Sequence, residues 1–133
     1  EQIIQYLYNK FGDVIDKQND SSTAFLNAAW DTNKKVIQYI YNTFKDEIDA
    51  ECSYRYLALT IAVRFNNTNE KVTQYLCDTF KDVIDINHQD VYGITVLMVA
   101  VRYNTNIKVI QCIYDTFKDT IDITLRNKKD DTL

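Results

Sequence analysis

Proline is absent from the 133-residue chain, and glycine occurs only twice. β-Sandwiches, β-barrels and glycine-loop nucleotide folds need many tight turns, which depend on these two residues. Their scarcity therefore counts against such folds and favours helices joined by turns that contain Asn and Asp. Hydrophobic residues make up 46% of the chain. That content lets a single domain bury a core, and intrinsic disorder is not expected.

An excess of positive charge is also missing, because 15 Lys and Arg stand against 19 Asp and Glu, for a net charge of -4. A nucleic-acid backbone needs clustered Lys and Arg, so we expect no nucleic-acid partner. The longest apolar stretches, such as Thr95 to Val101, fall far short of the ~20 residues that span a bilayer. We therefore expect no membrane insertion.

The cysteines indicate the compartment. Cys52, Cys77 and Cys112 are odd in number, lie far apart and form no CxxC motif. This pattern predicts free thiols in a reducing, intracellular compartment, and we expect a cytoplasmic location. A Cys₃His zinc site with His88 would need short ligand spacings that the chain lacks, so no metal is expected.

Few residues are suited to catalysis. The one histidine, His88, lies in the loop DINHQD, where Asp85 and Asp90 could hydrogen-bond it. A loop histidine between turn-forming aspartates is more often structural or exposed than catalytic. Calcium-loop and phosphate-loop motifs are absent. The sequence leaves open a pair of carboxylates that performs glycosidase-like catalysis. The aspartates recur with the helices, however, and a structural role in a scaffold explains this recurrence better. We expect no enzyme activity and no cofactor.

The chain does contain an internal repeat. Four segments share one 14-residue frame, and within each the apolar residues recur at the 3.6-residue helical period. Each segment therefore predicts a long amphipathic helix. The segments are IIQYLYNKFGDVID (3–16), VIQYIYNTFKDEID (36–49), VTQYLCDTFKDVID (72–85) and VIQCIYDTFKDTID (109–122). The phenylalanines that mark the frame are Phe11, Phe44, Phe80 and Phe117, at steps of 33, 36 and 37 residues.

A shorter, more apolar helical segment precedes each of the last three copies. In each segment a large apolar residue stands three positions before an alanine, which allows close approach of two helices. Asn/Thr-rich turns follow and can cap the next helix. The repeat unit is thus a short helix, a turn, a long helix and an Asp-led loop. The short segments are 22–30, 56–65 and 94–103, and the turns are 31–33, 66–69 and 104–106.

The third repeat places Asp90, Gly93, Thr95, Leu97 and Ala100 in a fixed register. These positions match the frame D-x-x-G-x-T-P-L-H-x-A-A, so the chain resembles the ankyrin repeat family. The proline and histidine of T-P-L-H and the helix-ending glycine are missing. The long helix also has more residues than the family's, and we expect it to be about one turn longer. Another solenoid of helix pairs is the alternative; a TPR pattern is not visible.

The resemblance implies an all-α fold, an α-solenoid of stacked helix-turn-helix, ankyrin-like repeats. We expect one array over 1–133, with 1–16 as the second helix of a partial repeat and 123–133 as the start of a further repeat. The complete repeats are expected at 17–49, 50–85 and 86–122. Because both ends cut a repeat, we expect the chain to be a fragment of a longer array.

The resemblance also implies a binding surface at the loop tips and along the short helices. All three repeats place an aromatic residue near the end of the short helix, in two of them beside an arginine. Trp, Tyr and Arg are enriched in interface hot spots. Packing over the turns is the competing interpretation, and it is the favoured one for Trp30. The expected tips are Ser21, Ser22, Tyr54, Arg55, Val91, Tyr92 and Ile94, and the expected helix-end residues are Trp30, Asp31, Arg64, Phe65, Arg102 and Tyr103.

The leading hypothesis is a non-catalytic protein–protein interaction scaffold that binds a partner protein through the concave face of the array. One alternative is an architectural, self-assembling element of a larger particle, which would use the tyrosine-rich side of the long helices. Another is the substrate-recruiting arm of a larger enzyme. The sequence does not identify the partner. The tyrosines of the long helices are Tyr6, Tyr8, Tyr39, Tyr41, Tyr75 and Tyr114.

Overall fold

The computed structural model describes residues 21–31, 33–50, 53–66, 70–104 and 106–129. These residues form helices and no strand, so the predicted all-α fold is confirmed for this part of the chain. The expected partial repeat at 1–16, Cys52 and residues 130–133 lie outside the described residues. The helices are α2 (Ser21–Ala28), α3 (Lys34–Thr43), α4 (Lys45–Asp49), α5 (Ser53–Phe65), α6 (Lys71–Phe80), α7 (Val96–Tyr103) and α8 (Ile107–Phe117).

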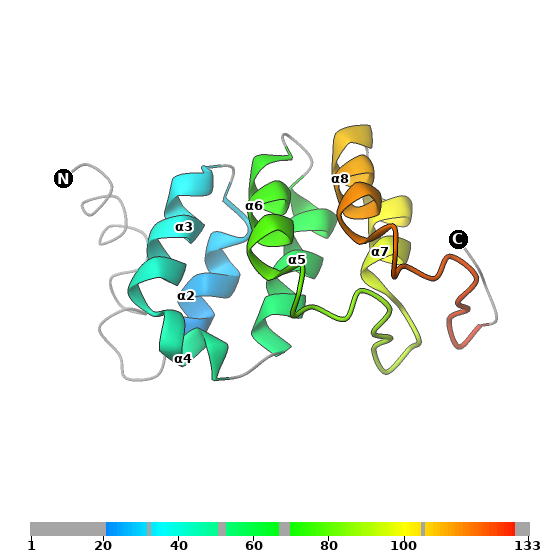
Figure 1. The fold of residues 1–133 in the computed structure, drawn as a ribbon, viewed down its shortest axis with the longest axis horizontal. Coiled ribbons are helices and arrows are strands. Elements are labelled where there is room, and N and C mark those ends of the chain that lie inside the picture. The colour runs from blue at the N-terminus through cyan, green and yellow to red at the C-terminus, as the bar shows by residue number, and fades with distance from the viewer. Residues whose placement is uncertain (1–20, 32, 51–52, 67–69, 105, 130–133) are drawn as a thin grey trace.

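Six of the seven described helices form three pairs that follow one another along the long axis of the molecule, and α4 packs against α2, α3 and α5 (Figure 1). Within each pair the two helices contact each other: α2 with α3, α5 with α6, and α7 with α8. Each helix also contacts its counterpart in the next pair. One layer therefore contains α2, α5 and α7, and the other contains α3, α6 and α8 (Figure 1).

The core lies between the two layers and is filled by the residues that the periodicity selects. Val36, Ile37 and Ile40 of α3 are fully buried. Leu76 of α6, which is equivalent to Ile40 in the repeat, is also fully buried. Phe25 of α2 meets Phe80 of α6 edge to face, with ring centroids 6.2 Å apart. Burying each such side chain contributes about 1.5–3 kcal/mol to the stability of the fold.

The long helices are shorter than predicted. The segment 36–49 is not one helix, because Phe44 leaves the helical region (φ -116°, ψ 29°) and separates α3 from α4. In the next two copies the helix ends at Phe80 and Phe117, and a hydrogen-bonded turn follows. The expected extra helical turn is therefore wrong. The short helix is not always the shorter one either, since α5 has 13 residues and α6 has 10.

Buried asparagines connect successive pairs at the turn end of each. Asn66 Nδ2 donates to the Asp31 carbonyl at 2.8 Å, and Asn104 Nδ2 donates to the Val63 carbonyl at 2.7 Å. The predicted capping by turn asparagines is confirmed at Asn33 and Asn106, whose side chains each accept a backbone N–H of the following helix. These bonds fix where one pair sits on the next.

The loop before α7 explains three residues of the repeat frame. Asp90 Oδ1 accepts the amides of Tyr92 and Ile94, at 2.8 and 3.0 Å. Gly93 has a φ of +78°, and a Cβ there would lie 2.9 Å from the backbone nitrogen of Lys128, so only glycine fits without strain. Thr95 then caps α7 through its side-chain oxygen. The frame residues thus form a tight turn and start the next helix.

Candidate binding surface

Four side chains from three successive helix pairs form a continuous stack, here called the ladder: Trp30, Phe65, Arg64 and Tyr103. The Trp30 and Phe65 rings lie face to face, with centroids 4.1 Å apart and an interplanar angle of 11°. The Arg64 guanidinium lies 4.9 Å from the Phe65 ring centroid and 3.8 Å from that of Tyr103. Each cation–π contact contributes about 0.5–1 kcal/mol at an exposed site.

The fold places the ladder where one layer of helices ends. Phe65 and Tyr103 are the last residues of α5 and α7, and Trp30 follows shortly after α2. Because α2, α5 and α7 pack side by side, their C-terminal ends lie side by side (Figure 1). Sequence reasoning selected these residues one repeat at a time, and the structure brings them into contact with one another.

The ladder is exposed. Trp30 is 53% exposed, and Phe65 and Tyr103 are each 44% exposed. Trp30 packs on Phe65, as the competing interpretation expected, but this packing leaves over half of the residue's surface in contact with water. Large aromatic residues that stay exposed together are typical of interaction sites.

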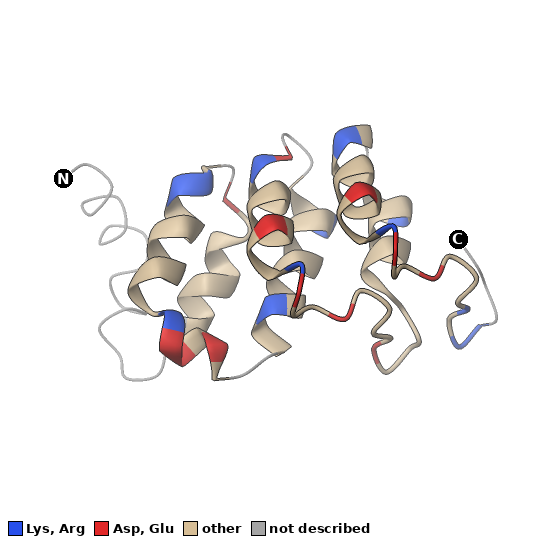
Figure 2. Cartoon of the chain, in the orientation of Figure 1, with Lys and Arg blue, Asp and Glu red and all other residues tan. Residues whose placement is uncertain are grey.

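Positive charge gathers at the same end of the molecule as the ladder. The end of the molecule where α3, α6 and α8 begin carries lysines from all three of these helices (Figure 2). Sequence reasoning missed them, although a lysine directly precedes the first valine in each of these copies: Lys35, Lys71 and Lys108. Arg102, another predicted site residue, is exposed beside Tyr103, and Arg64 and Arg102 together lower the pKa of the Tyr103 phenol.

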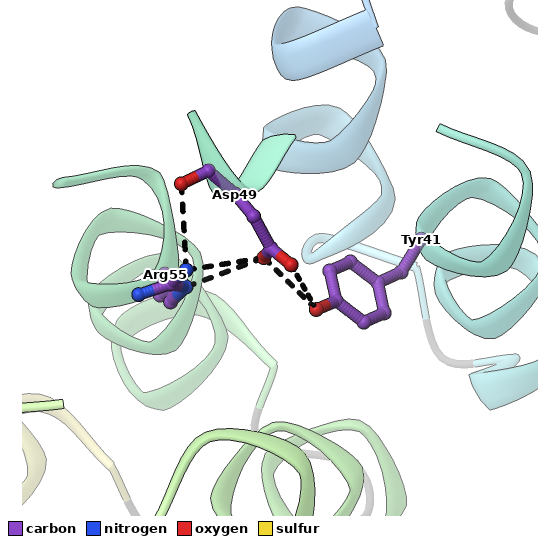
Figure 3. Close-up of polar contacts among 3 residues, drawn as sticks. All are labelled: Tyr41, Asp49 and Arg55. Carbon is purple, nitrogen blue, oxygen red and sulfur yellow. Dashed lines mark hydrogen bonds and ion pairs between the residues drawn. The ribbon is translucent and has the colours of Figure 1, made fainter. Parts of the chain in front are cut away.

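Tyr54 and Arg55 lie in the first turn of α5 instead of at a loop tip. The Arg55 side chain is 16% exposed and forms an ion pair with Asp49 at 3.3 Å. The Tyr41 hydroxyl also donates its hydrogen bond to the Asp49 carboxylate, with its oxygen 2.9 and 3.0 Å from the two carboxylate oxygens (Figure 3). Burial and this hydrogen bond raise the pKa of Tyr41. Arg55 therefore connects α4 and α5 internally.

The loop before α7 contains the predicted residues Val91, Tyr92 and Ile94 and lies at the opposite end of the molecule from the ladder (Figure 1). Ser22, another expected loop tip, is instead buried in the first turn of α2. Val91 is 72% exposed and Tyr92 is 67% exposed, as expected of loop-tip residues. Ile94 is half-buried, and its carbonyl accepts a hydrogen bond from the Tyr56 hydroxyl at 3.4 Å. The predicted site thus divides into two separate groups, of which only the ladder spans all three pairs.

His88 lies in a shallow cavity of about 210 Å³ whose lining includes Ser53 and Asp85. Its ring packs edge-on against Tyr56, with centroids 4.7 Å apart. The Asp85 carboxylate accepts the amide of Asn87, and no hydrogen bond joins it or Ser53 to the His88 ring in the described part of the chain. The cavity therefore lacks the hydrogen-bonded chain that activates a serine nucleophile.

Cys77 and Cys112 are free, buried thiols that lie together between α6 and α8. Their mutual hydrogen bond and burial raise the pKa of the Cys77 thiol. No group of three or more His, Cys, Asp or Glu side chains among the described residues is placed to hold a metal ion. No helix in the described ranges has both the length and the apolar character needed to cross a bilayer.

The chain matches no family model, no curated protein and no solved structure. Any functional conclusion therefore rests on the geometry of the molecule itself. Among the described residues, the ladder is the feature that unites the predicted site residues of all three pairs.

Proposed function

We propose that this chain is a non-catalytic, ankyrin-like α-solenoid that binds a partner protein. Two features support the repeat architecture: each pair contacts its neighbours in sequence, and Asp90, Gly93 and Thr95 form the turn that starts a new pair. Stacked repeats present an extended surface, which proteins of this class use for binding. The binding site was expected on the concave face of the array; we propose that it lies at the C-terminal ends of α2, α5 and α7, where the ladder is.

The observation that carries the proposal is the exposed ladder. Its rings hold each other in place, so the ladder side chains would lose little conformational freedom when a partner binds to them. Aromatic rings and arginine are also the side chains that contribute most to binding when truncated. The ladder therefore combines the residue types of a hot spot with a fixed geometry.

The test is a ladder variant that combines Trp30→Ala, Phe65→Ala and Tyr103→Ala. A matched control combines Leu57→Ala, Val83→Ala and Ile123→Ala, which truncate exposed apolar side chains outside the ladder and outside the other predicted binding residues. Partners recovered with the native chain and with the control are purified, and calorimetry measures their affinities. We expect the ladder variant to bind at least about tenfold more weakly, with an unchanged circular dichroism spectrum. Equal binding by the ladder variant contradicts the proposal.

One observation favours self-assembly as a second function. Some residues of α5 and α6 are buried under the following helix pair. The equivalent residues of α7 and α8 are exposed. Val63 is fully buried, but the matching Val101 is 48% exposed. Cys77 is likewise fully buried, and the matching Tyr114 is 50% exposed.

A second copy could cover this open face. Sedimentation velocity from low to high micromolar concentration tests the idea, and Tyr114→Glu should abolish any dimer. A monomer at every concentration contradicts self-assembly. A role as the substrate-recruiting arm of a larger enzyme stays a prediction.

A further inference from the structure

The charge around the ladder has the opposite sign to that of the whole chain. The net charge of the chain is -4. Yet the residues at the turn end of the three pairs include six cationic ones and two acidic ones, Asp31 and Glu70. The cationic residues are Lys34, Lys35, Arg64, Lys71, Arg102 and Lys108.

One of the two acids is turned away from solvent. Asp31 is 8% exposed, and its Oδ1 accepts the Asn33 amide at 2.8 Å. The N-terminal ends of α3, α6 and α8, which carry the positive ends of the helix dipoles, lie at the same end of the molecule. A ligand that approaches the ladder therefore meets a positive local potential in spite of the acidic chain.

The arginines of the ladder end are available for a ligand. The faces of the Arg64 guanidinium lie against the Phe65 and Tyr103 rings, so a ligand would hydrogen-bond to the N–H groups along its edge. Neither Arg64 nor Arg102 forms an ion pair in the described part of the chain, whereas Arg55 is paired with Asp49. A planar guanidinium held by ring stacking suits two-point hydrogen bonding to a carboxylate.

The stacked Trp30 and Phe65 rings add an apolar platform directly beside this guanidinium. A partner that uses both features needs apolar and acidic side chains close together. The ladder crosses three helix ends in a row, so an extended segment follows it better than a folded surface does. Nucleic-acid bases also stack on aromatic rings, but a phosphate backbone is charged along its whole length, whereas only two guanidinium groups lie at the ladder and the chain as a whole is acidic.

We propose that the ladder binds an extended acidic segment of a protein partner, in which Asp or Glu residues flank an aromatic or aliphatic side chain. This inference rests on the proposed function, because it names the chemistry of the partner at the same surface. The carboxylates would pair with Arg64 and Arg102, and the apolar side chain would pack on the Trp30 and Phe65 rings.

The experiment is a selection of random 12-residue peptides displayed on phage, with the native full chain as bait. Binders are then screened against two variants that change the net charge equally. Arg64→Glu with Arg102→Glu reverses charge at the ladder, and Lys81→Glu with Lys118→Glu reverses charge at the opposite end. Fluorescence anisotropy with the selected peptides, and with a labelled 12-residue oligo-dT, gives the affinities.

We expect selected peptides rich in Asp and Glu around an apolar residue. The ladder reversal should weaken their binding about tenfold or more, and the distal reversal should leave it within about twofold. Ladder-dependent peptides without an acidic excess overturn the inference but keep the proposed function. Ladder-dependent binding of oligo-dT without such peptides, or no ladder-dependent binder at all, overturns both.

Discussion

At the residue scale, one position of the repeat frame performs different tasks in different copies. Asp85 and Asp122 each accept the backbone amide two residues ahead and so begin the following loop. The equivalent Asp49 instead accepts the Tyr41 hydroxyl and pairs with Arg55 (Figure 3). The sequence predicted the aspartate but not its partners, because Tyr41 and Arg55 reach it only after α4 and α5 have packed.

Tyr41→Phe tests this cluster. Removing the hydroxyl should lower the free energy of unfolding by about 1.5–3 kcal/mol near pH 7, because the bond goes to a charged acceptor. Burial and the Asp49 hydrogen bond raise the pKa of Tyr41 in the folded chain. Its stabilisation is therefore complete below the unfolded pKa of about 10 and falls as pH rises above that value.

Urea unfolding at several pH values between 7 and 11 measures the effect. The stability difference between the native chain and Tyr41→Phe should shrink above about pH 10. Tyr114→Phe, at an exposed tyrosine, serves as the control. A difference that stays constant over the whole pH range would show that the hydroxyl has no raised pKa.

At the scale of helices and turns, periodicity predicted where helices form but not where they end. The apolar spacing continues from Val36 to Ile48 because both α3 and α4 bury residues of the same stripe. The apolar residues Ile40, Phe44 and Ile48 are four positions apart in the sequence, and this spacing does not reveal whether the helix continues or breaks at Phe44. Turn chemistry was more informative, since Asn33 and Asn106 act as the predicted caps. The reach of Asn104 to the preceding pair was not predictable from local sequence.

Asn104 offers a test of how elements are held together. Its Nδ2 donates to the Val63 carbonyl, and its Oδ1 accepts the Asn106 amide at 2.8 Å. Asn104→Asp keeps the acceptor and loses the donor, and it also places a carboxylate beside the Val63 carbonyl. We expect a loss of about 1–3 kcal/mol in the free energy of unfolding, because a buried carbonyl loses its partner.

Thermal and urea unfolding provide the measurement. Asn42→Asp, at an exposed position of α3, is the matched control and should change stability by less than about 0.5 kcal/mol. Equal effects of the two variants would mean that the Asn104 bond does not connect the pairs.

At the scale of the whole molecule, each helix pair depends on its neighbours. The α5–α6 pair contacts a pair on each side, whereas the α7–α8 pair leaves Val101, Ile107 and Tyr114 exposed. The aromatic residues and arginines of the ladder were selected in the sequence by their recurring position near the end of the short helical segment. Their stacking was not, because it depends on the register between pairs. The lysines at the same end did have a signal in the sequence, because a lysine directly precedes the first valine in each of the last three copies.

This arrangement predicts unequal local stability. In a stack of repeats, a pair with neighbours on both sides opens less readily than one with an open face. We expect amide hydrogen exchange, followed by mass spectrometry, to be slowest in α5 and α6 and faster in α7 and α8. Slower exchange in α8 than in α6 would contradict the prediction.

Trp30 is the only tryptophan of the chain, and it stands at one end of the ladder. Its indole is half in water and half against Phe65, so its emission is sensitive to anything that covers the outer ring face. The native chain therefore carries its own optical probe. A blue-shifted spectrum on mixing reports docking at the ladder in real time, with no dye attached and no residue replaced.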